Sequence, residues 1–149
     1  MRRKYKRKKG PVRANKVTVD GSKFASGLEK DMYLALKEAK IVARYEGETY
    51  VLQDNFEFKN ESYERQANGK GEMVNRGSKK VLPIKYTPDF ISDSFIIECK
   101  GRANESFPLR WKMFKKFVNK HLKRVTLYKP QNQKECDEVI KLITKKSKK

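Results

Sequence analysis

One strand–turn–strand segment constrains the fold of this chain more than any other feature. Residues 80–91 (KVLPIKYTPDFI) are rich in β-branched and aromatic side chains and predict a strand, which Pro83 and Pro88 break or confine to a sheet edge. Residues 95–100 (FIIECK) predict a further strand, and a polar turn at 92–94 joins the two. Because the turn is so short, the second strand should fold back onto the first within one sheet.

Hydrophobic spacing predicts the remaining elements. Ser26-x-x-Glu29 fits a capping box, and apolar residues at helical spacing extend the predicted helix to about Lys40. Lys16–Asp20 predicts a short strand or an extended segment, and a strand is predicted at about Thr49–Gln53. The chain is completed by a helix with Pro108 in its first turn, a strand at Val125–Tyr128, and a last helix with Cys136, Val139, Ile140 and Ile143. The order is helix, three strands, helix, strand, helix, which is an α/β class (mixed α+β).

Length and local composition predict one folded domain with basic extensions. A chain of 149 residues suggests a single domain, which we expect over 17–143. Residues 1–16 contain nine Lys or Arg and no acid and predict a disordered basic arm, and 144–149 contain four Lys and predict a basic tail. Residues 59–79 are polar and glycine-containing, which predicts a long mobile loop. The loop is either a DNA-contacting flap or a tolerated surface loop, and we favour the second.

The charge indicates a polyanionic partner. The net charge is +19, of which +6 remains on residues 17–143 without the arm and the tail. Basic segments bind nucleic acid by releasing condensed counterions, although a merely solubilising role is an alternative. No apolar stretch approaches the roughly 18 residues of a membrane span, and no apolar region follows the basic N-terminus as in a secretory signal. Cys99 and Cys136 form no CxxC pair, which argues against a disulfide framework or zinc site and favours an intracellular, soluble protein.

The strand at 95–100 carries the candidate chemistry. Side chains alternate along a strand, so Ile96, Glu98 and Lys100 share one face and the other face is apolar. The preceding strand ends in Pro88-Asp89, and the turn should bring Asp89 close to Glu98. Two close carboxylates repel unless a cation lies between them, and Mg²⁺ prefers such oxygen ligands. Lys100 could steer or deprotonate an attacking water, as phosphodiester hydrolysis requires.

Each of these residues has a simpler interpretation on its own. Asp89 could be only a turn residue, Glu98 and Lys100 could form a solvated strand face, and Glu29 could be only a capping carboxylate. The combined pattern is more specific than any single part. It consists of a helix glutamate, Pro-Asp at a strand end, a short turn, and then two apolar residues followed by Glu-x-Lys-Gly.

The combined pattern resembles a known family. Tyr86-Thr87-Pro88-Asp89-Phe90 and Ile96-Ile97-Glu98-Cys99-Lys100-Gly101 resemble the motif of the PD-(D/E)XK nuclease superfamily. Phe24-Ala25-Ser26-Gly27-Leu28-Glu29 is similar to the helix start of its phage endonuclease I branch, the Holliday-junction resolvases. The segment between this helix and Asp89 is longer than in that branch, chiefly through 59–79.

The resemblance implies a fold, a reaction and a set of roles. It implies a restriction-endonuclease-like core with a four-stranded mixed sheet flanked by helices. Asp89 and Glu98 would hold Mg²⁺ together with the backbone carbonyl of Cys99, and Mn²⁺ would substitute. Lys100 would be the catalytic lysine, and Glu29 would bind a second ion or position a water. Members cut DNA to leave a 5′-phosphate, and resolvases act as homodimers, inside the bacterial host if the chain is phage-encoded.

The second helix offers candidate phosphate contacts. The candidates are one residue just after the motif, Arg102, and four basic residues of the helix, Arg110, Lys112, Lys115 and Lys116. A solvated amphipathic face is the alternative. Trp111 is in phase with the apolar positions and should be a core residue. The leading prediction is a structure-selective endonuclease that acts on branched DNA. A nuclease without junction preference and a non-catalytic nucleic-acid-binding protein are the alternatives.

Overall fold

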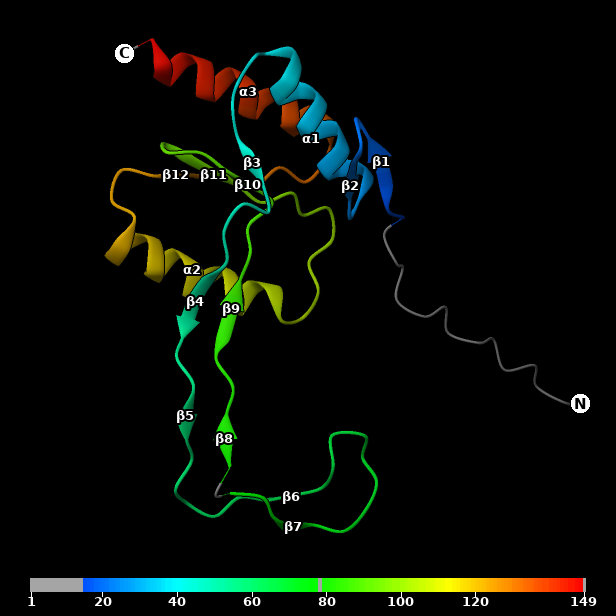
Figure 1. Ribbon diagram of the computed structural model, residues 1–149, viewed down its shortest axis with the longest axis vertical. Coiled ribbons are helices and arrows are strands. Elements are labelled where there is room, and N and C mark those ends of the chain that lie inside the picture. Colours follow the sequence, from blue (N-terminus) through cyan, green and yellow to red (C-terminus); the bar gives the residue numbers. More distant parts are fainter. Residues whose placement is uncertain (1–14, 78, 149) are drawn as a thin grey trace, which may run out of the picture. The chain divides into compact units, whose positions relative to one another are not determined.

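The computed structural model describes residues 15–77 and 79–148 (Figure 1). The first fourteen residues of the predicted basic arm and Lys149 of the predicted tail lie outside this range. Contacts divide the chain into two compact units. Unit 1 comprises the residues up to Ala43, Ile97–Arg102, and the residues from Tyr128 onward, and unit 2 comprises Arg44–Ile96 and Ala103–Leu127. The described chain is a mixed α+β protein with three helices, in agreement with the predicted class.

Unit 1 begins with a β-hairpin that precedes its first helix. β1 (Val17–Val19) pairs antiparallel with β2 (Ser22–Phe24). Between them Asp20 and Gly21 have φ angles of 51° and 78°, the left-handed conformation that a two-residue turn with a positive φ at both positions requires. The short strand predicted at Lys16–Asp20 is therefore confirmed as β1, whereas its partner β2 was not predicted.

Two helices pack together in unit 1. α1 (Gly27–Glu38) begins at the predicted capping residue Ser26 and buries Met32 and Leu36. α3 (Gln133–Ser147) buries one apolar stripe that consists of Cys136, Val139 and Ile143. Because α3 continues to Ser147, most of the predicted basic tail forms the last turns of this helix.

A four-stranded mixed sheet contains the strand–turn–strand segment. Its order is β12 (Thr126–Tyr128), β11 (Phe95–Ile97), β10 (Phe90–Ile91) and β3 (Arg44–Tyr45), and β10 runs antiparallel to β3. The predicted four-stranded mixed sheet is therefore present. One of its two edge strands is the two-residue β3, however, and the strand predicted at 49–53 lies outside this sheet.

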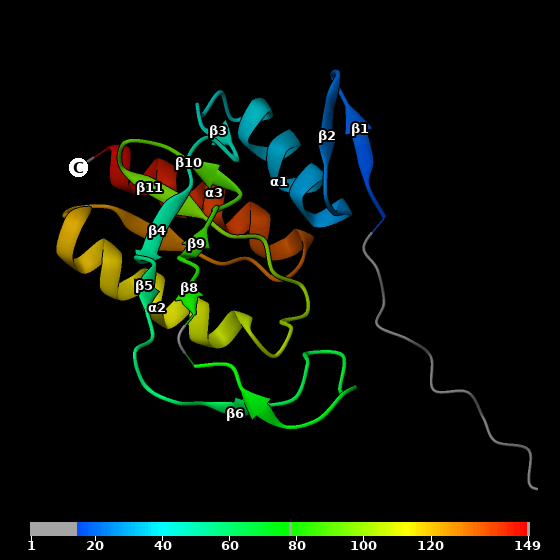
Figure 2. The same cartoon turned by 60° about the horizontal axis from the view of Figure 1, so that its bottom comes forward.

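Unit 2 contains a long β-arm, formed by residues 50–86. β4 (Tyr50–Gln53) pairs with β9 (Ile84–Tyr86), β5 (Phe56–Glu57) with β8 (Lys80–Val81), and β6 (Tyr63–Glu64) with β7 (Val74–Asn75) (Figures 1 and 2). All three pairs are antiparallel and lie one inside the other along the sequence. The predicted strand at 80–91 is split into three pieces at its prolines, as expected. The segment predicted as a loop at 59–79 contains β6 and β7.

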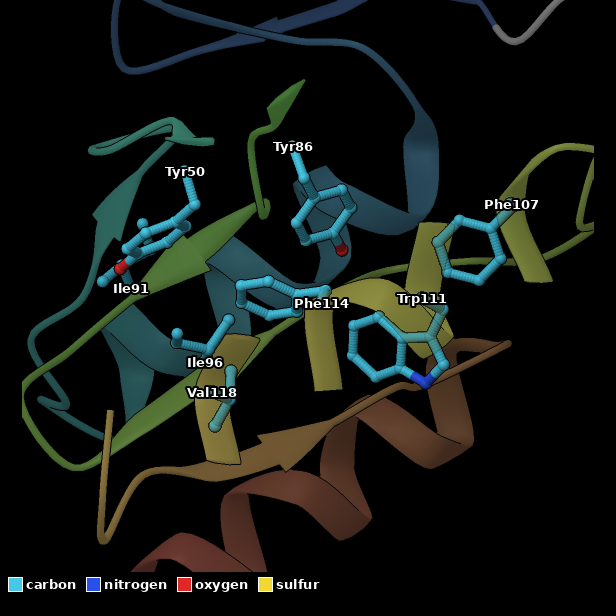
Figure 3. Close-up of a cluster of buried hydrophobic side chains, with 8 residues drawn as sticks. All are labelled: Tyr50, Tyr86, Ile91, Ile96, Phe107, Trp111, Phe114 and Val118. Atoms are coloured by element: carbon cyan, nitrogen blue, oxygen red, sulfur yellow. The ribbon is translucent and has the colours of Figure 1, made fainter. Parts of the chain in front are cut away.

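An aromatic cluster forms the core of unit 2 (Figure 3). α2 (Phe107–His121), with Pro108 in its first turn as predicted, packs Trp111, Phe114 and Val118 against the strands. Phe114 is fully buried, with ring centroids 4.5 Å from Tyr86 and 5.6 Å from Tyr50. The core position predicted for Trp111 is confirmed, because only 8% of this residue is exposed.

Two further properties concern membrane-spanning helices and the cysteine side chains. In the part of the chain that the structure describes, no helix has the length and apolar character needed to cross a bilayer. Cys99 and Cys136 are both buried, and within the described residues neither forms a disulfide. Burial raises the pKa of the Cys136 thiol to about 11, and the negative charges of Asp31, Asp137 and Glu135 add to this effect.

Candidate functional site

The predicted catalytic residues are divided between the two units. Glu29, Glu98, Cys99 and Lys100 belong to unit 1. Asp89 belongs to unit 2 and stands directly before β10. Each unit therefore holds some of the predicted residues.

Glu29 lies in the first turn of α1 and is tied to the start of the helix. Its Oε1 accepts a hydrogen bond from the hydroxyl of Ser26 at 2.8 Å, and its Oε2 accepts one from the backbone N–H of Ala25 at 3.1 Å. The backbone N–H of Glu29 donates to the Ser26 hydroxyl at 3.2 Å. The predicted capping interaction of Ser26 and Glu29 is therefore present. The carboxylate is also buried, with 7% of the residue exposed, which capping alone does not require.

Glu98 and Lys100 lie on one extended segment after β11. The N–H of Glu98 donates to the carbonyl of Tyr128 at 2.9 Å, and the N–H of Lys100 donates to that of Pro130 at 3.0 Å. These two bonds continue along the chain in the same direction, which is the pattern of parallel pairing. Because residues two apart on an extended chain point to the same side, Glu98 and Lys100 are expected to share a face. The strand assignment itself ends at Ile97, one residue before Glu98.

Two buried carboxylates distinguish unit 1. Glu29 and Glu98 are the buried charged side chains among the described residues, and both belong to this unit. Glu98 is 6% exposed, whereas Lys100 is half-buried. A buried carboxylate is costly unless hydrogen bonds or a cation compensate its charge, and clusters of such groups mark functional sites. The predicted alternative of a solvated strand face is therefore wrong for Glu98.

The backbone on both sides of Asp89 is held firmly within unit 2. The preceding Pro88 is fully buried, and the carbonyl of Asp89 accepts a hydrogen bond from the N–H of Glu46 at 2.8 Å. The Asp89 residue itself is half-buried. After β10 the N–H of Ser92 donates to the carbonyl of Phe95 at 2.9 Å, which closes the turn that leads into β11. The predicted strand–turn–strand arrangement is therefore confirmed.

The donor set can be tested against the chemistry of a metal ion. Across residues 15–77 and 79–148, no group of three or more His, Cys, Asp and Glu side chains is arranged to hold an ion. Mg²⁺ needs fewer protein ligands than that, because it usually keeps several waters and binds through one or two carboxylates. Glu98, Asp89 and the carbonyl of Cys99 are all hard oxygen donors. Their chemistry fits Mg²⁺ or Mn²⁺ and does not suit a thiol-bound metal.

The predicted phosphate contacts are exposed. Arg102 lies in unit 1, and four others project from α2 in unit 2; these are Arg110, Lys112, Lys115 and Lys116. The Nζ of Lys115 lies 5.9 Å from the centre of the Trp111 ring. The chain contains no Asp or Glu between Glu105 and Glu135, so α2 carries only positive formal charge. Such a helix attracts phosphate.

Sequence patterns did not predict a groove beside α2. This β4–α2 groove has a volume of about 300 Å³ and is lined by Leu52, Gln53, Met113, Lys116, Phe117, Lys120 and His121. Of these residues, only Lys116 was predicted to bind DNA. The missing signal was tertiary, because the groove exists only where Leu52 and Gln53 of β4 approach α2.

Comparison with known proteins identifies a family and nothing beyond it. Residues 4–132 match the family model described as "Protein of unknown function (DUF1064)". No curated protein and no solved structure matches the chain at a significant level. The match covers most of the chain and includes every predicted catalytic residue.

Proposed function

Given that the chain belongs to the DUF1064 family, which is described as one of unknown function, we propose from its own residues that it is a magnesium-dependent DNA endonuclease. The reaction is hydrolysis of a phosphodiester bond, with Asp89, Glu98, Lys100 and Glu29 as the catalytic residues. The proposed fold is the restriction-endonuclease-like core of the PD-(D/E)XK superfamily.

One observation carries the proposal. Glu98 is buried and lies two residues before Lys100 on one segment, whose backbone is fixed by bonds to Tyr128 and Pro130. A binding module for DNA has no use for an acidic group that faces phosphate, because a carboxylate repels phosphate. A nuclease needs it to hold a cation where phosphate is attacked.

Chain connectivity supports the inclusion of Asp89. Asp89 directly precedes β10 and Glu98 directly follows β11, and these strands are neighbours in one sheet. The turn at 92–94 makes them antiparallel, so the start of one strand and the end of the next belong to the same end of the hairpin. This is the connection by which we propose that the two carboxylates cooperate.

The proposed roles follow from the chemistry of each group. Asp89 and Glu98 would hold the ion together with the carbonyl of Cys99, and Glu29 would hold a second ion or position a water. When bound, Mg²⁺ supplies positive charge for the phosphate and lowers the pKa of its waters. Lys100 neutralises charge that develops on the phosphate oxygens and orients the attacking water.

The proposed substrate is branched DNA, such as a four-way junction. No base-reading motif is present in the sequence, so we propose recognition of backbone and shape. The proposed phosphate contacts are Arg102, Arg110, Lys112, Lys115 and Lys116. Resolution of a junction requires paired nicks, which is why the proposed active form is a homodimer. The proposed location is inside the cell, where the proposed substrate is found. A nuclease of the same core without junction preference is the second candidate.

A cleavage assay tests both parts of the proposal. The full chain is incubated with a four-way junction and with linear duplex of the same sequence, each with Mg²⁺ or with EDTA. We expect paired nicks in the junction only when Mg²⁺ is present. Equal cutting of both substrates would select the second candidate. An absence of cutting with Mg²⁺ and with Mn²⁺ would reject the nuclease and leave a non-catalytic DNA-binding protein.

A further inference from the structure

The β4–α2 groove combines an apolar floor with a cationic rim. Leu52, Met113 and Phe117 supply apolar surface and are all partly buried, whereas Lys116, Lys120 and His121 are exposed at the rim. Among the residues that the structure describes, no acidic side chain lines it. All of its residues belong to unit 2, so the groove is complete within one compact unit.

Helical spacing explains how α2 builds both parts. Met113, Phe117 and His121 follow one another at four-residue intervals and therefore lie along one side of the helix. The rings of Phe117 and His121 are 4.6 Å apart at their centroids, with an interplanar angle of 38°. Lys116 and Lys120 repeat the same interval on the adjacent line. Like charges at this spacing destabilise an isolated helix, so the pair is better explained by an anion than by helix stability.

We propose that this groove binds one unpaired nucleotide of a DNA strand, with its base against Phe117 and His121 and its phosphates against Lys116 and Lys120. Aromatic platforms beside cations are how proteins bind single strands without reading sequence. Ligand pockets span ~300–1,000 Å³, so the groove, with a volume of about 300 Å³, is among the small ones. Its size suits a single base. The choice of DNA as the ligand rests on the proposed function, whereas the groove itself does not.

Photocrosslinking tests the position of the base. The full chain in EDTA is irradiated with a single-stranded oligonucleotide that carries one 5-iododeoxyuridine, and the adduct is digested with a protease that cuts after glutamate. Because no acid lies between Glu105 and Glu135, the whole of α2 is released in the peptide 106–135. We expect the crosslink in this peptide at Met113, Phe117 or His121. Crosslinks confined to other peptides would overturn the proposal.

Binding by paired variants tests the phosphate contacts. We expect Lys116→Ala/Lys120→Ala to weaken binding of the oligonucleotide about tenfold at 0.1 M salt, and to reduce the log–log salt slope by about 1.4, since each single-strand phosphate contributes about 0.7. The control Lys134→Ala/Lys141→Ala removes the same charge from exposed positions of α3 and should change affinity less than about twofold. Equal losses in both pairs would mean bulk charge alone and would reject the groove.

Competition with a free nucleotide shows whether the groove holds a strand. Thymidine 5′-monophosphate at micromolar concentration should leave the oligonucleotide complex intact. If it displaces the oligonucleotide, the occupant of the groove is a free nucleotide and the proposal of a bound strand is overturned. All binding is measured in EDTA, where no metal-dependent cleavage occurs. Crosslinking in the groove without any DNA cleavage in Mg²⁺ would therefore support this inference and contradict the proposed nuclease activity. Cleavage without crosslinking in the groove would contradict this inference and support the nuclease activity.

Discussion

The carboxylate of Glu29 accepts a hydrogen bond from the Ser26 hydroxyl at 2.8 Å, while the Glu29 N–H donates back to that hydroxyl at 3.2 Å. α3 begins in the same way, because the Glu135 N–H donates to Oδ1 of Asn132 at 3.0 Å and the Glu135 carboxylate accepts from the N–H of Gln131 at 2.7 Å. The two glutamates differ in burial, since Glu29 is buried and Glu135 is partly exposed. The chain thus contains its own control for the role of Glu29.

We predict that Glu29→Gln lowers the DNA cleavage rate at least about tenfold, whereas Glu135→Gln leaves it unchanged. Glutamine also satisfies a capping box, so both variants should keep their melting temperatures close to that of the native protein. Glutamine cannot, however, carry the negative charge that a second ion or a positioned water needs. Cleavage rates and thermal melts of both variants check this. Equal cleavage rates in the two variants would reduce Glu29 to a capping residue.

Asp89→Asn and Glu98→Gln should each lower metal-dependent cleavage by at least about 100-fold while DNA affinity in EDTA is kept, because charge at the metal is lost and the phosphate contacts are not. Asp93→Asn removes the same charge from an exposed position of the adjacent turn and should cut DNA normally. The measurements are single-turnover cleavage and fluorescence anisotropy. Native rates in either site variant would remove that residue from the site.

The aromatic core should depend on one ring. Phe114 is fully buried among Tyr50, Tyr86 and Trp111, so Phe114→Ala should lower the free energy of unfolding by about 3–5 kcal/mol through lost burial and a cavity. Leu109→Ala on the same helix, where 66% of the residue is exposed, should change it by less than about 0.5 kcal/mol. Urea denaturation of both variants compares these values, and similar midpoints would contradict the packing described.

Gly77 should be essential to the strand pairing of the β-arm (residues 50–86). A Cβ atom at this position would overlap the backbone oxygen of Asn60, so Gly77→Ala must displace one side of the arm, at a cost of about 1–3 kcal/mol. The Arg76 N–H, which donates to the carbonyl of Ser62 at 2.7 Å, should then exchange faster with solvent. Gly27→Ala meets nothing within 4 Å and serves as the control. Unchanged protection of the Arg76 amide would show that the close approach is absent.

Cys136 should make stability fall at high pH. Its thiol ionises near 9.0 in the unfolded chain, whereas burial raises its pKa to about 11 in the folded protein. Because the folded state favours the protonated thiol, its contribution is complete below about pH 9 and is lost as pH rises toward 11, a loss of about 2–3 kcal/mol. Urea unfolding between pH 8 and about pH 11 measures this. Cys136→Ala lacks the thiol and should lose less stability over that range; equal losses would refute the assignment.

Local signals predicted the elements that depend on neighbouring residues. The capping pair at Ser26 and Glu29 placed the start of α1, and Pro108 placed the start of α2. The apolar spacing of α2 correctly placed Trp111 in the core. The β1–β2 hairpin was missed although Asp20-Gly21 is a recognised signal for a two-residue turn.

The remaining features depend on residues far apart in the sequence. β3 has only two residues, and it is a strand because it pairs with Phe90 and Ile91. Two residues are too few to show the alternating pattern that predicts a strand. Alternation predicted the shared face of Glu98 and Lys100, but the burial of Glu98 depends on packing that one strand cannot reveal. The β4–α2 groove was missed for the same reason.

The nested pairing of the arm has a consequence for how unit 2 folds. The innermost ladder joins Glu64 to Val74, so its closure involves only a short loop and a small loss of chain entropy. Once it has formed, β5 meets β8 and then β4 meets β9, and each step closes only a few more residues. Tyr50 and Tyr86 are distant in sequence, yet they can be brought together by zipping from the tip of the arm rather than by one long-range encounter.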